Sequence, residues 1–444
     1  MIRQRLLHPA RIVAFAFLVA ILIGTALLMM PFAREGGGSV PFLTALFTAT
    51  SAVCVTGLAI VDTGTYWSSA GQATIMLLFQ IGGFGMMTGA TLLGLMVNRS
   101  PRLRLKLITQ TETHTLGLGD VANVAKLVLT VTIVCEFIVA LVLTLRFRLG
   151  YGLEWQQAAW SGLFHSVSAF NNAGFSIHAD SVMRYAPDAL VLLPLMLAIF
   201  IGGIGFPVLM DLRDKTRSPR SWSLHTKLTL AVTGFLLALG FLGILIFEWH
   251  NAKTLGAMAL PEKILSAAFT SVSARTAGFN TIDLAVASRE TWSLHYLLMF
   301  VGAGSAGTAG GVKVGTVAIL FLLVLAEIRG HPDSEAFGRR VGGAAQRQAV
   351  TVLVLGSATV ILGTTILLSV SDATTDRVIF EVISAFGTVG LSTGITADLP
   401  AAGQFVLVAL MYLGRIGTIT LATSLILGER RMPYRYPEEH PIVG

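Results

Sequence analysis

The sequence predicts an all-helical polytopic membrane protein in which four similar units surround one pore. Composition is the first observation: 54% of the 444 residues are hydrophobic, 12% are charged, and the mean hydropathy is +0.75. A soluble protein carries about twice that charged fraction. The second observation is a glycine-containing segment that occurs four times, with its glycines 117, 104 and 112 residues apart. A recurring spacing of this kind indicates one structural unit used repeatedly.

The recurring segment begins with Ser-Ala and continues to a glycine followed by an apolar residue. Its four copies are 51–58 (SAVCVTGL), 168–175 (SAFNNAGF), 273–279 (SARTAGF) and 384–391 (SAFGTVGL). An ordinary glycine turn in a helical bundle would explain any one copy. The shared Ser-Ala and the spacing argue against that explanation for all four, and four such loops in one chain can close a ring around a single ion path.

Each unit reads as a long helix, a short apolar helix, the glycine loop and a second long helix. We expect the first long helices over 12–30, 124–145, 226–248 and 348–370, and the second over 70–97, 189–211, 292–327 and 403–428. The short helices are expected over 41–52, 157–169, 262–274 and 376–385, which are too short to span a bilayer and suit re-entrant pore helices. The loops that follow them then line a watery cavity. The expected units are 1–99, 100–215, 216–335 and 336–428, with a cytoplasmic tail over 429–444.

Basic residues set the expected orientation. The amino terminus could be mistaken for a signal peptide, but it has no clear cleavage site, so we interpret it as an uncleaved first span. Basic residues cluster there and after each second helix, at 3, 5 and 11, at 99–106, at 213–220, at 329–340 and at 430–435. The positive-inside rule places both termini and these clusters in the cytoplasm, and the glycine loops enter from outside. The net charge of +7 is therefore attributed to these loops and not to nucleic-acid binding. Two cysteines, Cys54 and Cys135, are too few for a disulfide framework.

The glycine loops are the candidate ion-binding site. A dehydrated cation needs oxygens in place of its water shell, and rings of backbone carbonyls supply them. Glycine permits the required backbone angles, and each short helix points its partially negative end at the ion. The loops contain no carboxylate at this position, which disfavours a calcium-type site. The candidate residues are Val55, Thr56, Gly57, Asn172, Ala173, Gly174, Thr276, Ala277, Gly278, Thr388, Val389 and Gly390.

The second long helices carry a recurring glycine motif, at 81–85, 201–205, 301–305 and 413–417, which predicts close helix packing. In the third unit this becomes a run of five glycines in ten residues, so we expect that helix to break in mid-membrane and to form a gate. A helix-packing face is the alternative. The candidate gate residues are Gly302, Gly304, Ser305, Gly307, Thr308, Gly310, Gly311, Lys313 and Arg415.

Three charged residues within the expected spans need an explanation. Arg415 lies in mid-span, where an arginine is costly and faces a cavity or a partner; it either braces helices or projects toward the pore. Lys313 either caps the second half of the broken helix or extends toward the cytoplasm. Glu136 is interpreted as a packing residue and not as an ion site.

These segments resemble the Trk/Ktr/HKT superfamily of potassium transporters, and most closely the membrane subunit of bacterial Ktr systems. The resemblance rests on 47–62 (FTATSAVCVTGLAIVD), 163–176 (LFHSVSAFNNAGFS), 271–283 (SVSARTAGFNTID) and 384–392 (SAFGTVGLS). It implies eight spanning helices and a filter glycine at positions 57, 174, 278 and 390, which points to potassium as the transported ion. It also implies that the broken helix holds a mobile gate and that Arg415 projects into the pore below the filter.

The resemblance further implies partners. Ktr membrane subunits form homodimers on a cytoplasmic ring of RCK-type nucleotide-binding subunits, so ATP or ADP is expected on that partner and no organic cofactor on this chain. Sodium stays open as an activator or coupled ion. The bacterial cell membrane is the implied location, and the tail 432–444 is a candidate contact surface.

Two other function classes fit the sequence less well. A secondary transporter of another cation or a small metabolite commonly uses inverted repeats, whereas all four units here begin and end on the same side. An enzyme is disfavoured because the sequence lacks His-Glu-x-x-His, Gly-x-Ser-x-Gly and a nucleotide-binding loop. Potassium uptake is therefore the favoured function.

Overall fold

The computed structural model describes residues 9–97, 118–427, 437 and 439. Within them the element order expected from the sequence occurs four times. The first long helices are α2 (Pro9–Leu28), α7 (Leu118–Tyr151), α11 (Leu224–Glu248) and α15 (Gly343–Val370). The short helices are α3 (Phe42–Val53), α8 (Trp155–Phe170), α12 (Leu260–Ser273) and α16 (Thr375–Gly387). The basic clusters at 3–5, 99–106 and 430–435, and most of the tail 432–444, lie outside the described residues.

The second long helices differ from one another. In the first and fourth units they are continuous, α5 (Ser69–Val97) and α17 (Ala401–Leu427). In the third unit the expected break is present between α13 (Arg289–Phe300) and α14 (Val314–Ile328). In the second unit our prediction of one helix over 189–211 was wrong, because α9 (Ala189–Ile204) and α10 (Phe206–Asp214) meet at an angle of 96°. Gly205, between them, has a φ of 98°, a left-handed conformation that ends a helix.

Small elements connect the long ones. They are α4 (Thr63–Tyr66), the antiparallel pair β1 (Glu335–Ala336) and β2 (Arg339–Arg340), and six 3₁₀ turns: η1 (Pro31–Ala33), η2 (Met183–Tyr185), η3 (Pro219–Ser221), η4 (Leu255–Ala257), η5 (Leu284–Val286) and η6 (Thr396–Asp398). Side-chain caps start several helices. Ser223 accepts from the Thr226 amide at α11, and Asp188 accepts from the Leu190 amide at α9.

Burial separates the helices into an inner and an outer set. Nine of the thirteen residues of α16 are buried, against five of the twenty-eight of α15. The short helices therefore form the interior, and the first long helices face outward. This is the distribution expected of a protein whose outer surface contacts lipid.

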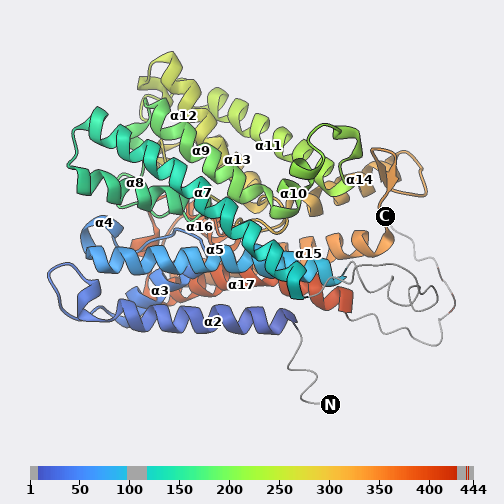
Figure 1. Cartoon of the computed structure of the whole chain (residues 1–444), viewed down its shortest axis with the longest axis horizontal. Coiled ribbons are helices and arrows are strands. Elements are labelled where there is room, and N and C mark those ends of the chain that lie inside the picture. The colour runs from blue at the N-terminus through green and yellow to red at the C-terminus, as the bar shows by residue number, and fades with distance from the viewer. Residues whose placement is uncertain (1–8, 98–117, 428–436, 438, 440–444) are drawn as a thin grey trace, which may run out of the picture.

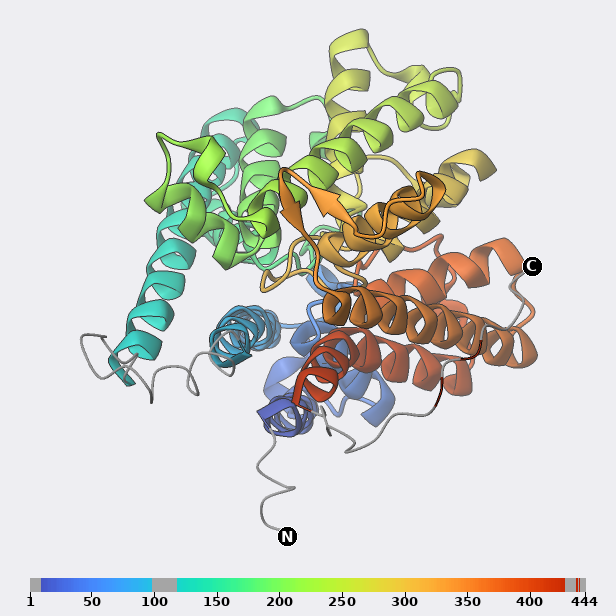
Figure 2. The same ribbon diagram turned by 90° about the vertical axis from the view of Figure 1, so that its right-hand side faces the viewer.

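The four units follow one another around a centre (Figure 2). Packing between α5 and α7, α9 and α12, α14 and α15, and α17 and α2 closes the circle in chain order. Along the long axis, α4 and α8 lie at one end and α10 and α14 at the other (Figure 1). The basic segments 213–220 and 329–340, which follow α10 and α14, therefore share one end of the molecule.

In the described part of the chain, fewer helices have the length and composition of a membrane span than the eight expected. Within the described residues, four helices are long and apolar enough to cross a bilayer, or five if α9 and α10 count together. The breaks in the second and third units shorten their helices below this length. The expectation of eight spans and of the unit boundaries stays a prediction.

Candidate functional site

The four glycine loops, 55–57, 172–174, 276–278 and 388–390, share one unusual backbone conformation. The first residue of each has a positive φ: 56° at Val55, 56° at Asn172, 76° at Thr276 and 49° at Thr388. The glycine two residues later is also left-handed, with φ of 92°, 70°, 76° and 93° in chain order. A non-glycine residue with positive φ is uncommon. Its recurrence at four equivalent places indicates a conformation required at the site.

The serine of the Ser-Ala motif fixes each loop. Ser51 Oγ accepts from the Gly57 amide at 3.0 Å, and Ser384 Oγ accepts from the Gly390 amide at 3.2 Å. In the other two loops the hydroxyl donates to the carbonyl after the glycine: Ser168 to Phe175 at 2.8 Å and Ser273 to Phe279 at 2.6 Å. The motif is therefore explained by hydrogen bonding that holds a strained loop to the helix before it.

The four glycines meet in a ring. A Cβ added at Gly57 would lie 2.9 Å from Gly174 Cα, and one added at Gly174 would lie 2.9 Å from Gly278 Cα. A Cβ at Gly278 would lie 2.5 Å from the Val389 oxygen, and one at Gly390 would lie 3.1 Å from Gly57 Cα. Each glycine thus faces the backbone of the neighbouring units. Only glycine fits there, because of both the φ and the close approach.

A cavity of 370 Å³ opens above this ring and is lined by all four glycines. Asp62 is the carboxylate among its lining residues, and its side chain accepts from the Thr65 amide at 2.8 Å to cap α4. In the part of the chain that the structure describes, no three His, Cys, Asp or Glu side chains gather as a metal site. The carbonyl oxygens of Thr56, Ala173, Ala277 and Val389 lie against the ring glycines.

Two histidines stand behind the second loop. The rings of His165 and His178 stack with centroids 4.8 Å apart, and His165 Nε2 is 2.9 Å from Ser176 Oγ. His178 also lines the cavity above the ring. Burial, helped by the nearby Arg184 guanidinium, lowers the pKa of His178 to about 4. This residue is therefore neutral at physiological pH.

The recurring glycines of the second helices also have a definite role. A Cβ at Gly82, Gly202 or Gly414 would collide with the carbonyl of Val53, Phe170 or Phe386, at or next to the last residue of the short helix. The predicted close packing is thus between the second helix and the end of the short helix of the same unit. It places these helices directly beneath the glycine loops.

The α13–α14 loop (301–313) lies against the ends of the short helices of the second and fourth units, at Phe170 and Gly387. Its neck is closed by a parallel bridge between Val301 and Val312, with the Gly302 amide donating to the Val312 oxygen at 2.8 Å. One side is bonded to the second unit: the Gly304 and Thr308 amides donate to the Gly203 and Gly202 oxygens at 2.9 and 3.0 Å.

The other side of the same loop contacts the fourth unit. A Cβ at Gly310 would meet the Thr388 hydroxyl and lie 3.0 Å from the Gly387 oxygen, and one at Gly311 would lie 3.3 Å from Gly387 Cα. The loop therefore spans from the second unit to the fourth. Ser305 lies at the bend of the second unit, where a Cβ on Gly205 would collide with the Ser305 oxygen. At Gly307, a Cβ would lie 2.6 Å from the Gly203 oxygen.

Arg415 of α17 is fully buried and holds this loop. Its guanidinium donates to the Thr308 oxygen and, at 3.2 Å, to the Gly82 oxygen of the first unit. Among the described residues no carboxylate forms an ion pair with it. Lys313, immediately before α14, donates to the Ala309 oxygen and to the Gly310 oxygen at 3.3 Å. Its side chain therefore folds back onto the loop, which matches neither a helix cap nor an extension toward the cytoplasm.

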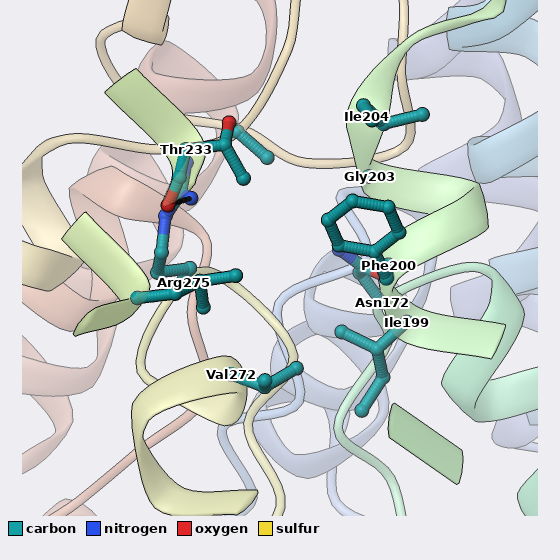
Figure 3. A pocket seen from close by; sticks show the side chains of 10 residues that line it. Asn172, Ile199, Phe200, Gly203, Ile204, Thr233, Val272 and Arg275 are labelled. Carbon is teal, nitrogen blue, oxygen red and sulfur yellow. Dashed lines mark hydrogen bonds between the residues drawn. The ribbon is translucent and has the colours of Figure 1, made fainter. Parts of the chain in front are cut away.

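Arg275 is a site residue that our sequence analysis missed. It is 4% exposed and donates to the Gly302 oxygen at 2.9 Å and the Thr233 oxygen at 3.4 Å. It lines a cavity of 20 Å³ between the second and third units, opposite Asn172, Phe200 and Gly203 (Figure 3). The signal was available in the sequence, since Arg275 interrupts an apolar motif at the point where the other copies have Cys, Asn or Gly.

Glu136 lies behind the second loop, away from the ring. Its carboxylate accepts from Asn171 Nδ2 at 3.2 Å and from Gln80 Nε2 at 3.4 Å. These contacts tie α7 to α5 and to the end of α8. They are the contacts of a packing residue, as the sequence suggested.

Comparisons with known proteins agree with this architecture. A family model described as TrkH, cation transport protein, matches residues 2–430. The chain is 38% identical to the Ktr system potassium uptake protein B of Bacillus subtilis, covering 98% of this chain and 97% of the relative. It is 36% identical to the potassium/sodium uptake protein NtpJ of Enterococcus hirae, covering 100% and 98%.

A solved structure has the same fold. The potassium transporter TrkH from Vibrio parahaemolyticus superimposes with a TM-score of 0.69 at 19% identity, covering 92% of this chain and 84% of that one. The helical content, the apolar outer helices and these matches describe a multi-pass membrane protein that is not an enzyme. The chain belongs to the TrkH family of cation transport proteins.

Proposed function

We propose that this chain is the potassium-translocating membrane subunit of a Ktr-type uptake system. Ions would flow in a channel-like manner through the ring of glycine loops, and the α13–α14 loop with Arg415 would form the gate beneath it. The four units, with boundaries at 1–99, 100–215, 216–335 and 336–428, would each contribute one quarter of the filter. Both termini would lie in the cytoplasm of a bacterial cell.

The observation that carries the proposal is the ring of four left-handed glycines. A positive φ at every second residue lets successive carbonyls turn to the same side of the chain, which a filter built from carbonyl rings requires. The ring is formed by neighbouring units in chain order, so the oxygens of all four would face one axis. The candidate filter residues named from the sequence are the members of these four loops.

The contacts of the α13–α14 loop support its role as a gate. It is bonded to the second unit and packed on the fourth, so in this conformation it obstructs the path beneath the ring. Arg415 places a fixed positive charge at the same level, which raises the barrier for a cation. Opening the path would require breaking the bonds of Thr308 and Gly304.

Relatives bear on the choice of ion. Three of them are named for potassium uptake and one for potassium and sodium uptake. Potassium is therefore the proposed substrate, and sodium is the second candidate, either as a transported ion or as an activator. Glycine at all four filter positions favours potassium.

We also propose a homodimer that docks on a cytoplasmic RCK-type ring carrying ATP or ADP. The basis is that the relatives are named as components of Ktr systems. The basic segments 213–220 and 329–340 lie at one end of the molecule and offer the surface for that contact. A pulldown with a purified RCK subunit would lose binding when these residues are neutralised.

The experiment that tests the function is potassium uptake in a strain without its own potassium systems, at low external potassium, with rubidium and sodium as competitors. We expect rescue by this chain together with an RCK subunit, competition by rubidium, and loss of rescue in Gly174→Asp. Failure to rescue with the partner present would favour a carrier of another cation or of a small metabolite. Competition by sodium as strong as that by rubidium would favour the sodium candidate.

A further inference from the structure

An apolar pocket lies outside the proposed ion path, between the fourth unit and the first. It has a volume of 460 Å³ and is lined by residues of α2, α15 and α17, by Phe386 at the end of α16 and by Val312 of the α13–α14 loop. This volume lies within the range of small-molecule sites. We propose that this pocket binds one acyl chain of a membrane phospholipid, and that the bound chain stabilises the α13–α14 loop in its closed position. The gating part of this inference rests on the proposed function.

The lining chemistry selects an apolar occupant. Thr359 and Tyr412 are the polar side chains of the pocket, and both already have partners within the protein. Thr359 Oγ1 donates to the Leu355 oxygen at 2.8 Å, and the Tyr412 hydroxyl donates to the Ala14 oxygen at 2.9 Å. These two hydroxyls have no hydrogen left to donate, so a ligand whose polar atoms are acceptors would lose its hydration without replacement.

The surroundings of the pocket determine which apolar molecule reaches it. α15 spans the bilayer by length and composition, and only 22% of its span is buried. At the rim of the pocket, Leu355 is 41% exposed and Leu413 is 50% exposed. These positions lie in mid-helix, where the solvent of the protein is lipid hydrocarbon. An acyl chain can therefore enter sideways from the membrane.

A single cation on α15 gives a place for the headgroup. Arg347 is exposed and is the only Lys or Arg of α15, and it lies eight residues before Leu355. At 1.5 Å per residue that distance is about 12 Å along the helix. A phosphate near Arg347 would therefore lie about two helical turns from the pocket along the axis, a distance that an acyl chain covers.

The inner wall of the pocket connects the gate to the filter. Val312 forms a buried cluster with Val352 and Phe386, and Phe300 at the start of the loop stacks on Phe386 with centroids 6.1 Å apart. Phe386 lies two residues before the fourth glycine loop and packs on Gly414 through its carbonyl. An occupant that contacts both Val312 and Phe386 binds the conformation seen here, so it shifts the equilibrium toward the closed loop.

Two glycines allow a matched test. Gly417 lines the pocket, and a Cβ built on it meets nothing within 4 Å, so Gly417→Leu has open space at its first side-chain atom and extends into the pocket. Gly234 of α11 also has open space around its Cβ and faces lipid, but it lies far from the pocket in chain and fold, so Gly234→Leu is the control. Thr359→Phe fills the pocket from its other wall and serves if Gly417→Leu does not fold.

The full chain in vesicles that contain phosphatidylglycerol with a photoreactive group in mid-acyl chain provides the measurement. We expect cross-links on peptides that contain 352–359 or 412–417, reduced about tenfold, which corresponds to about 1.4 kcal/mol, in Gly417→Leu and unchanged in Gly234→Leu. Even labelling of all outer helices, or the same labelling in Gly417→Leu, would overturn the site. A second copy of the chain is the alternative occupant. It would be indicated if two Leu413→Cys chains form a disulfide and the lipid labels the pocket only after the copies are separated. That result would overturn the proposed lipid site.

Rubidium flux through the same vesicles tests the gating part. We expect the leucine of Gly417→Leu to replace the acyl chain against Val312 and Phe386, so that flux stays low and no longer varies with acyl-chain length. Variation with chain length that equals that of Gly234→Leu would overturn the gating part. If no variant conducts rubidium with an RCK subunit and ATP present while the labelling pattern holds, the lipid site stands and the proposed transport function fails.

Discussion

Gly390 and Gly394 form a natural pair for measuring the close approach at the ring. Their φ values are 93° and 92°, so alanine costs both positions a similar conformational strain, about 1–2 kcal/mol. A Cβ at Gly390 would also collide with the Thr56 oxygen, whereas one at Gly394 meets nothing within 4 Å. We expect Gly390→Ala to abolish potassium uptake and Gly394→Ala to retain it, with equal loss in both variants contradicting the ring.

The buried guanidinium of Arg415 contributes both a charge and a brace, and two substitutions separate them. Arg415→Ala removes both, so we expect rubidium flux to rise because the Thr308 contact with the loop is lost. Arg415→Lys keeps the charge but cannot reach the Thr308 and Gly82 oxygens together, since an ammonium lacks the planar fork. Raised flux in both variants would assign the closure to the brace, and raised flux only in Arg415→Ala would assign it to the charge.

The neutral His178 makes the stability of the folded protein sensitive to acid. Its pKa is about 4 in the folded protein and about 6.5 in the unfolded chain, so between these values the unfolded chain binds more protons. Stability should therefore fall as the pH drops from 6.5 to 4. We expect the slope of melting temperature against pH in this window to be shallower in His178→Gln, and an unchanged slope would contradict the assignment.

At the scale of elements, the α13–α14 loop is expected to control flux. Its glycine-rich backbone packs closely on the second and fourth units and is held by the amide hydrogen bonds of Gly304 and Thr308. Deleting part of 304–311 while keeping the bridge between Val301 and Val312 should raise rubidium flux several-fold. Flux equal to that of the wild type would demote the loop to helix packing.

Sequence reasoning was accurate for the helices and less so for their breaks. Long apolar runs and Ser-Ala motifs located the short helices within a few residues, and five glycines in ten residues predicted the break before Val314. The bend at Gly205 was missed because the equivalent glycine motifs at 81–85 and 413–417 are compatible with continuous helices, which α5 and α17 are. The decisive factor is tertiary: Ser305 of another unit packs against Gly205, and no local pattern reports that.

The glycines of the site were predictable from the sequence, but the hydrogen bonds between its elements were not. The third loop is one residue shorter from its serine to its glycine, yet Thr276 and Gly278 adopt the same left-handed pattern. Repetition therefore located all four loops. Hydrogen bonds between units, such as those of Arg415 to Thr308 and to Gly82, depend on which helices become neighbours, and a linear sequence does not state that.

At the scale of the whole molecule, the orientation can be measured directly. Both native cysteines are buried, so the wild-type chain is a suitable background for added thiols. Asp398 is the last residue of η6, at the end of the molecule where the cavity above the ring opens. Arg329 follows α14 at the other end. Each can be replaced by cysteine. We expect a membrane-impermeant maleimide to label Asp398→Cys in intact cells and Arg329→Cys only after permeabilisation. The reverse pattern would invert the proposed topology.

Four units joined in one chain can diverge in a way that four identical subunits cannot. Here the second long helices of two adjacent units are interrupted, α9–α10 and α13–α14. Those of the other two units, α5 and α17, are continuous. A homotetrameric pore must move all its inner helices alike, and four copies of one loop would crowd the axis. Covalent linkage removes that restriction: under the proposed function, the one loop between α13 and α14 would obstruct the path while α5 and α17 stay continuous on the opposite side.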